Sequence, residues 1–389
     1  MKRAELRGLS LSISLLIAVS VLPALSQAAQ PVKPEPAKFE KKKQEPLITS
    51  PSVGADGKVT FSVFAPHARV VTLSGDFGGP PTALQKDAEG VWLATVSLKP
   101  GLWGYSFSID GQKQMDPGNA WNKPSRVAST SAVLVPATPP AAFEYQGAAE
   151  GTVHLHTYNP KALGYQRRLR VYTPAGYEKG NTRYPVLYLL HGHSDNEASW
   201  TQFGHAHVIA DNLMAAKQAV PAIIVMTDGH AVPMDRNRSL ENLEKFQVDV
   251  LEAVIPFVDS HYRTKANAND RAIVGLSMGG EQALTLGMTH PETFAWVGGM
   301  SAATRRSEVF SKALDMPDVL NKKLRLLWIA IGKGDFLLEA NHKFIEEITA
   351  KGIKHEYKET EGDHSWPVWR GYLIDILPRL FQKPAKLKA

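Results

Sequence analysis

Five residues in the second half of the chain have the pattern of a nucleophile elbow. Gly275-Leu276-Ser277-Met278-Gly279 fits G-x-S-x-G, and it stands between an apolar stretch typical of a buried strand, 272–275, and a helical pattern over 279–289. A sharp strand-to-helix turn crowds its central residue, so the flanking positions must lack side chains. The pattern predicts that Ser277 is an exposed nucleophile near the positive end of the following helix.

A serine hydroxyl is a poor nucleophile unless a base takes its proton, and the order serine, acid, histidine puts that base downstream. His364 stands between the last predicted strand, 355–358, and the last predicted helix, 367–380. His154 and His156 could form half of a metal site, but the sequence offers no third ligand and favours a surface strand. We therefore expect His364 to be the general base and expect no metal.

The acid of such a triad should follow the strand that comes after the elbow unit. Asp335 ends the predicted strand 326–331 and precedes His364. It would hold the imidazole tautomer and stabilise the imidazolium ion. Asp363 and Glu361 are the alternatives, and Asp363 is awkward because neighbouring side chains in an extended loop point apart.

A tetrahedral intermediate needs backbone N–H donors, each worth roughly 3 kcal/mol. The residue after the nucleophile, Met278, would supply one. The loop after the predicted strand 186–190 would supply the other from His193, with Gly192 allowing the tight turn. For His191 we prefer a role in bracing this loop to a catalytic role.

The region 143–384 alternates short apolar strands with helical patterns. Strands are predicted at 169–172, 186–190, 222–226, 272–275, 295–299, 326–331 and 355–358, and helices at 208–219, 248–262, 279–289, 336–351 and 367–380. This alternation predicts an α/β fold, a mainly parallel sheet with helices on both faces. Ligands bind such sheets at the carboxyl ends of the strands.

The region 51–137 has a different pattern. Alternation with a period of two occurs at 59–64, 70–73, 91–96 and 105–109, with turn signals at Pro100-Gly101 and Asp110-Gly111. We predict a small all-β, immunoglobulin-like sandwich.

The N-terminus has the features of an export signal. Basic residues precede an apolar run over 9–25, and Ser26-Gln27-Ala28 offers small residues for cleavage after Ala28. An uncleaved membrane anchor is the alternative, although the run is shorter than the roughly 20 residues that span a bilayer. We expect a signal peptide over 1–28, a disordered linker over 29–50, and export to the periplasm or the cell exterior.

The composition excludes several classes of protein. The 389 residues contain no cysteine, which rules out disulfide scaffolds, cysteine nucleophiles and cysteine-ligated zinc. Lys and Arg number 44 against 38 Asp and Glu, but part of the net charge of +6 lies in the two tails. We expect no nucleic-acid partner and, after signal cleavage, no stable membrane insertion.

Spaced motifs of the second region form a set: Tyr188-Leu189-Leu190-His191-Gly192, Glu197, Trp200, Gly275 to Gly280, Gly334-Asp335 and His364 to Trp369. The set resembles the esterase D and enterochelin-esterase-like α/β hydrolases, and most closely the first family of carbohydrate esterases. The first region resembles the early-set, glycogen-binding-like domain through Gly90-Val91-Trp92 and Asp116-Pro117-Gly118-Asn119. One departure is that His193-Ser194 stand where the family often has further glycines.

The resemblance implies an esterase that removes feruloyl or acetyl groups from plant polysaccharide through an acyl-enzyme, without a cofactor. Two alternatives stay open. The same site could cleave a trilactone siderophore such as enterobactin, which a strongly basic pocket would favour, or the chain could be mainly a glycan-binding protein.

Aromatic side chains near these motifs could stack on a sugar or aryl ring. We predict Trp200 and Trp366 as such platforms, and leave Trp369 equally open to core packing. For Trp92, Trp103 and Trp121 of the first region we favour packing over a glycan-binding surface.

Overall fold

The computed structural model describes residues 46–233, 239–305 and 307–382. The predicted signal peptide 1–28 and linker residues 29–45 lie outside these ranges. The last linker residue, Ser50, is 4% exposed, and its Oγ donates to Asp116 at 2.5 Å and accepts from the Ser62 amide. Ser50 is thus bonded to the first region. No helix within the described ranges combines the length and the apolarity that crossing a bilayer requires.

The first region forms two facing antiparallel sheets. One has the order β1-β2-β6-β5 and the other β4-β3-β7-β8, with β9 also paired to β7. The strands are β1 (Ser52–Val53), β2 (Lys58–Phe64), β3 (Val71–Gly75), β4 (Thr82–Ala83), β5 (Gln85–Lys86), β6 (Val91–Ser97), β7 (Gly101–Ile109), β8 (Gln112–Gln114) and β9 (Ser131–Val135). Alternate residues of β2 enter the core between the sheets, because successive side chains of a strand point to opposite faces.

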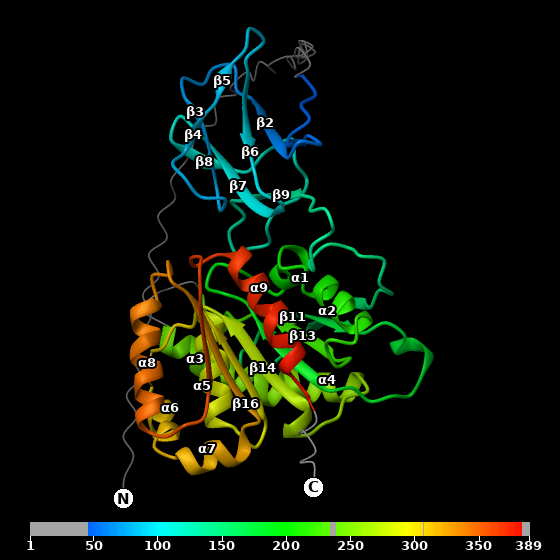
Figure 1. Ribbon diagram of the computed structural model, residues 1–389, viewed down its shortest axis with the longest axis vertical. Helices are drawn as coiled ribbons and strands as arrows, with labels where there is room; N and C mark the ends of the chain where they lie inside the picture. The colour runs from blue at the N-terminus through cyan, green and yellow to red at the C-terminus, as the bar shows by residue number, and fades with distance from the viewer. Residues whose placement is uncertain (1–45, 234–238, 306, 383–389) are drawn as a thin grey trace, which may run out of the picture. The chain divides into compact units, whose positions relative to one another are not determined.

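The second region is built on an eight-stranded sheet with the order β10-β11-β13-β12-β14-β15-β16-β17 (Figure 1). The strands are β10 (Thr152–Tyr158), β11 (Arg167–Thr173), β12 (Val186–Leu190), β13 (Ile223–Thr227), β14 (Arg271–Leu276), β15 (Trp296–Met300), β16 (Leu326–Gly332) and β17 (Glu356–Thr360). β10 and β11 pair antiparallel, as do β11 and β13, and the pairs from β13 to β17 are parallel.

Helices cover both faces of this sheet (Figure 1). The main helices are α1 (Ser199–Gln202), α2 (Ala206–Ala215), α3 (Ser239–Asp249), α4 (Ile255–His261), α5 (Met278–Thr289), α6 (Glu308–Leu314), α7 (Pro317–Lys323), α8 (Leu338–Ala350) and α9 (Trp366–Ile376). Tyr188 of β12 packs in the core under α3 to α8, whereas Leu187 and Leu189 pack in the core under α2 and α9. The predicted fold class is confirmed.

One predicted helix, 248–262, contains a π-helical turn. The structure is helical without a break up to His261: α3 ends at Asp249, the π-helical turn covers Val250–Val254, and α4 starts at Ile255. Pro256 lies in the first turn of α4. A proline ring lacks the N–H that an uninterrupted helix would use and clashes with the preceding turn, so the backbone widens there.

Candidate active site

Ser277 lies at a strained turn between β14 and α5. Its backbone has φ 52° and ψ −116°, and its amide donates to the carbonyl of Met300 at 2.9 Å. The first and last residues of the motif must be glycine because a side chain at either position would clash with the backbone of a neighbouring segment. A Cβ on Gly275 would lie 2.2 Å from the carbonyl oxygen of Gly279, and one on Gly279 would lie 2.4 Å from that of His191. The elbow predicted from the motif is therefore present in the backbone.

Three side chains that are far apart in the sequence form one hydrogen-bonded chain. His364 Nε2 lies 3.0 Å from Ser277 Oγ, and His364 Nδ1 lies 2.8 Å and 3.0 Å from the two carboxylate oxygens of Asp335. Of the two acids weighed from sequence beside Asp335, Asp363 bonds to Ser365 and Glu361 pairs with Lys333. The structure thus brings together the serine, the histidine and the acid that the sequence favours.

Two neighbouring loops hold Asp335 against His364. Asp335 follows β16, and the loop after β17 carries Gly362 and His364. The Gly334 amide donates to the carbonyl of Gly362 at 2.8 Å, and a Cβ on Gly332 would lie 2.4 Å from that same carbonyl oxygen. The glycines let the two loops touch, which fixes the distance between the acid and the imidazole.

The environment of Asp335 favours the ionised carboxylate. Burial by itself raises the pKa of Asp335, but hydrogen bonds from His364, the Leu337 amide and Ser301 outweigh it, so the pKa lies below its usual value. The carboxylate therefore stays charged through neutral pH and favours the Nδ1-protonated imidazole. In that tautomer Nε2 has a free lone pair directed at the serine hydroxyl.

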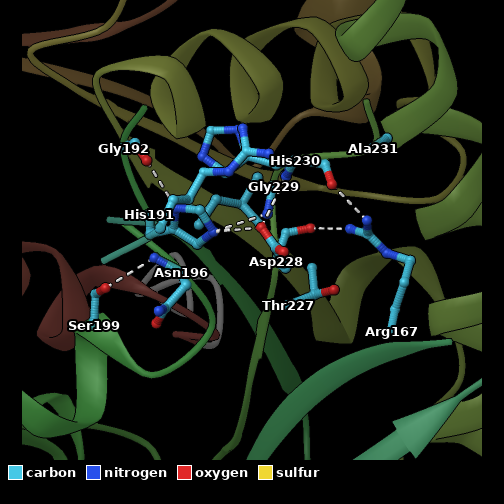
Figure 2. Close-up of polar contacts among 12 residues, drawn as sticks. Arg167, His191, Gly192, Asn196, Ser199, Thr227, Asp228, Gly229, His230 and Ala231 are labelled. Atoms are coloured by element: carbon cyan, nitrogen blue, oxygen red, sulfur yellow. Dashed lines mark hydrogen bonds and ion pairs between the residues drawn. The ribbon is translucent and has the colours of Figure 1, made fainter. Parts of the chain in front are cut away.

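The loop after β12 is braced by His191 (Figure 2). Its Nδ1 lies 2.8 Å from the carbonyl of Gly192, and the Gly229 amide donates to its Nε2 at 2.8 Å. Burial lowers the pKa of His191, but the carboxylate of Asp228, 3.4 Å from Nε2, raises it by more. The hydrogen bond from the Gly229 amide to Nε2 in turn favours a neutral ring with its proton on Nδ1. His191 therefore ties the loop after β12 to the loop after β13, as the bracing role requires.

A buried arginine anchors the second of these loops. Arg167 of β11 donates to the carbonyl oxygens of Asp228 and His230 (Figure 2). It also pairs with Asp249 at 3.1 Å. The loop 228–230 is thus fixed from β11 on one side and by His191 on the other.

The predicted oxyanion donors flank Ser277. Gly192 lies against the serine: a Cβ built on it would be 3.5 Å from the Cβ of Ser277. His193 follows directly in the chain and lines the same cavity as Ser277. Met278 is the first residue of α5, where helix geometry provides no intrahelical acceptor for the N–H. The role of these amides remains a prediction.

A cavity of about 560 Å³ opens beside Ser277. Apolar side chains of Val232, Leu243 and Phe336 line part of it, and Asn242 and Gln282 add amide groups. Phe336 is 76% exposed, and its ring centroid lies 4.4 Å from that of His364. The cavity therefore combines an apolar lining with a few fixed polar groups, as small-molecule sites usually do.

A family model with the description "Putative esterase" matches residues 161–380, more than half of the chain. The chain belongs to this esterase family. A second model, carbohydrate-binding module 48 (isoamylase N-terminal domain), matches residues 49–127. The resemblance of both regions inferred from their motifs is confirmed.

Similar proteins include esterases of two kinds. An endo-1,4-beta-xylanase/feruloyl esterase of Xylanibacter ruminicola is 33% identical over 347 residues, covering 85% of this chain and 46% of that protein. A solved ferulic acid esterase is 25% identical with a TM-score of 0.53 over 60% of this chain and 99% of its own. An enterobactin esterase from Shigella flexneri has a TM-score of 0.64 at 21% identity, covering 84% and 93%. The chain spans about half the length of the first of these relatives.

The structure corrects one predicted substrate residue and limits another. Trp200 is 1% exposed, and its indole N–H donates to the carbonyl of Leu190, so it cannot serve as a stacking platform. Trp366 is 3% exposed and packs edge to face against Trp200, although it lines a second cavity beside Ser277. Trp369 is also buried and donates to Ser301 Oγ. These large rings fill the core under α9, which the sequence spacing does not distinguish from a site.

Sequence reasoning missed the charged residues around Ser277. Arg126 and Arg305 line the cavity, and Arg305 forms a fork with both oxygens of Glu281 at 2.6 and 2.8 Å. The sequence contains one indication that Glu281 lies near the site: it follows Ser277 by one helical turn, which places the two residues on the same side of α5.

The first region also reaches the serine. Asp76 and Lys123 line the second cavity, of about 360 Å³, together with Ser277 and His364. Burial raises the pKa of Asp76 to about 6, against the Gly104 amide and the charges of Arg370 and Lys123. Nothing in the sequence of the strands indicates that these two side chains belong near the elbow.

The two histidines of β10 contact the hydroxyl groups of other side chains. His154 Nε2 lies 3.0 Å from Thr173 Oγ1, and His156 Nε2 lies 2.5 Å from the hydroxyl of Tyr262. Among the residues that the structure describes, no group of three potential ligands is close enough to hold a metal ion.

Proposed function

We propose that this protein is a serine carboxylic ester hydrolase that acts through an acyl-enzyme. The observation that carries the proposal is the chain of contacts from Asp335 through His364 to Ser277, located at a strained elbow beside a cavity. Membership of the esterase family supports the same reaction class.

In the proposed first half-reaction, Ser277 Oγ attacks the ester carbonyl carbon while its proton moves to His364 Nε2. The amides of His193 and Met278 bind the oxyanion that forms. As the intermediate collapses, the C–O bond to the alcohol breaks and His364 returns the proton to that oxygen. Asp335 stabilises the imidazolium ion between these two transfers.

In the second half-reaction, water takes the place of the alcohol. His364 removes a proton from the water as its oxygen attacks the acyl-enzyme. Collapse of the second intermediate breaks the bond to Ser277 Oγ, which regains its proton, and releases a carboxylic acid. No cofactor enters this scheme.

We infer that the acyl group is aromatic, of the feruloyl type. An acetyl group would leave most of the cavity of about 560 Å³ empty. The exposed ring of Phe336 beside His364 offers an aryl group a stacking surface at the reacting carbon. The Xylanibacter relative, an endo-1,4-beta-xylanase/feruloyl esterase, and the solved ferulic acid esterase support the same acyl class.

A trilactone siderophore is the second candidate, because Arg126 and Arg305 line the cavity and would attract catecholate charge. The pairing of Arg305 with Glu281 cancels part of that charge, and Glu281 is buried. This compensation favours the neutral aryl ester over the polyanion.

The test is a comparison of methyl ferulate, acetylated xylan and a catecholate trilactone as substrates. We expect methyl ferulate to have the highest kcat/KM, and Ser277→Ala to lower it by about 10⁴-fold or more. Ser260→Ala, at an exposed position of α4, is the matched control and should keep wild-type rates. Unchanged hydrolysis in Ser277→Ala would refute the triad, and a preference for the trilactone would refute only the acyl assignment.

We also propose that the protein is exported and acts on esterified polysaccharide. The basic and apolar pattern of residues 1–28 supports export, and the match of residues 49–127 to a carbohydrate-binding module supports the polymer. N-terminal sequencing of protein recovered from the periplasm or the medium should begin at Ala29. Retention of the full chain in the cytoplasm would contradict this part of the proposal.

A further inference from the structure

A cavity of about 620 Å³ lies where residues 120–122 meet β10, β11 and the α1–α2 segment. Its polar and aromatic lining consists mainly of Trp121, Asn122, Arg170, Gln202, His205 and His207. None of its described lining residues is shared with either cavity at Ser277. We call it the Trp121 cavity.

The aromatic wall of this cavity is held in place. The ring of Trp121 stacks on that of His205, with centroids 6.0 Å apart and planes 12° from parallel. The indole N–H of Trp121 lies 3.3 Å from the carbonyl of Gln202, and His205 Nδ1 lies 2.9 Å from the carbonyl of Phe143. A fixed indole is a suitable apolar surface for the face of a pyranose ring. The side-chain amides of Asn122 and Gln202 are suitable partners for sugar hydroxyls.

The cavity carries positive charge that its own lining does not neutralise. None of the described residues that line it is acidic, and no residue that the structure describes forms an ion pair with the guanidinium of Arg170. Arg170 Nε and His207 Nδ1 are both buried without a hydrogen-bond partner. Burial, with His205 and Arg170 nearby, lowers the pKa of His207 to about 4, so this ring is neutral and can accept a hydrogen bond.

The guanidinium of Arg170 is partly buried, and a ligand carboxylate would supply the acceptor that its Nε lacks. The planar guanidinium matches a carboxylate with two parallel hydrogen bonds. An aromatic face, amide groups and an arginine together suit a sugar that bears a carboxylate. We therefore infer that the Trp121 cavity is a second binding site, separate from the proposed catalytic centre, for a uronic acid substituent of a polysaccharide.

The experiment is isothermal titration calorimetry of the full chain with two probes of similar size. One is xylotriose carrying a single glucuronic acid, and the other is neutral xylotetraose. We expect the acidic probe to bind at least about tenfold more tightly. Arg170→Gln should remove this preference, and Arg170→Lys, which keeps the charge without the planar fork, should give an intermediate affinity.

Two controls keep the result interpretable. Arg168→Gln changes an exposed arginine two positions away on the same strand and should leave binding of the acidic probe unchanged. Hydrolysis of p-nitrophenyl acetate by Arg170→Gln should equal that of the wild type, which reports folding and keeps this test separate from the triad. Equal affinity for both probes, full binding by Arg170→Gln, or inorganic phosphate binding as tightly as the acidic sugar would overturn the inference.

Discussion

Replacement of Asp335 by Asn is the sharpest test of the proposed triad. The change keeps the shape of the side chain but removes the negative charge next to His364 Nδ1, now 2.8 Å from the nearer oxygen. An amide at this position can donate to Nδ1, which would place the imidazole proton on Nε2. That tautomer cannot accept the proton of Ser277.

The expected loss follows from the charge interaction that the transition state gains. An imidazolium ion and a carboxylate about 4 Å apart interact by about 4 kcal/mol at an effective dielectric constant near 20. That energy corresponds to about 10³-fold in rate, and the wrong tautomer adds up to about another tenfold. We expect kcat/KM to fall by about 10³- to 10⁴-fold, mainly through kcat, because Asp335 lies behind His364.

The assay is steady-state hydrolysis of methyl ferulate and p-nitrophenyl acetate by Asp335→Asn and by Asp363→Asn. Asp363 is next to His364 in the chain but bonds to Ser365 instead, so its replacement should change kcat/KM by less than about threefold. Thermal melting should show that both variants fold. Equal losses in the two variants, or more than a tenth of the activity left in Asp335→Asn, would refute the assignment of the acid.

Two further predictions concern residues that position the site. His191→Ala should lower kcat about 10- to 100-fold with little change in KM, because the substitution loosens the loop that carries a proposed oxyanion donor without removing that donor. The control His67→Ala, at an exposed position, should leave kcat and KM unchanged. A large rise in KM alone for His191→Ala would contradict the bracing role. Asp76→Asn should stabilise the protein by up to about 3 kcal/mol at pH 8, because a folded pKa of about 6 against 3.8 makes the charged carboxylate unfavourable above pH 6. This gain should shrink as the pH falls from 6 to 4, where the carboxyl is neutral in the folded protein and then also in the unfolded chain. Urea unfolding of the wild type and Asp76→Asn at pH 8 and at pH 4 measures this difference in the free energy of unfolding. A stabilisation that is larger at pH 4 than at pH 8 would contradict the raised pKa of Asp76.

The strands and the proximity of Ser277, His364 and Asp335 could be predicted because their signals are local. Each strand of the parallel sheet is a short apolar run, and the elbow needs small residues at fixed spacing, both of which are visible in a window of a few residues. His364 and Asp335 could be found because each directly follows a predicted strand. The carboxyl ends of parallel strands lie at one edge of a sheet, so order in the chain determined proximity in space.

The burial of the tryptophans and the charged residues near Ser277 could not be predicted, because they depend on contacts between segments that are distant in the sequence. Trp200 and Trp366 have the residue type of a stacking platform, and only the packing of α1 against α9 shows that they are buried. Arg126 and Asp76 come from the first region and reach cavities formed by the second. Their position depends on how the two regions pack, for which the sequence contains no periodic signal.

The packing of the two regions follows in part from one buried arginine. Arg370 of α9 donates to the carbonyl of Phe203 at 3.0 Å and to that of Leu102, at the start of β7. Leu102 and Ala132 of the first region belong to the same apolar core as α9. Because α9 begins two residues after His364, the helix that orients the imidazole is itself fixed by the first region. The β-sandwich therefore contributes to the geometry around His364, and removing it, Leu102 included, would leave the guanidinium of Arg370 without one of its acceptors.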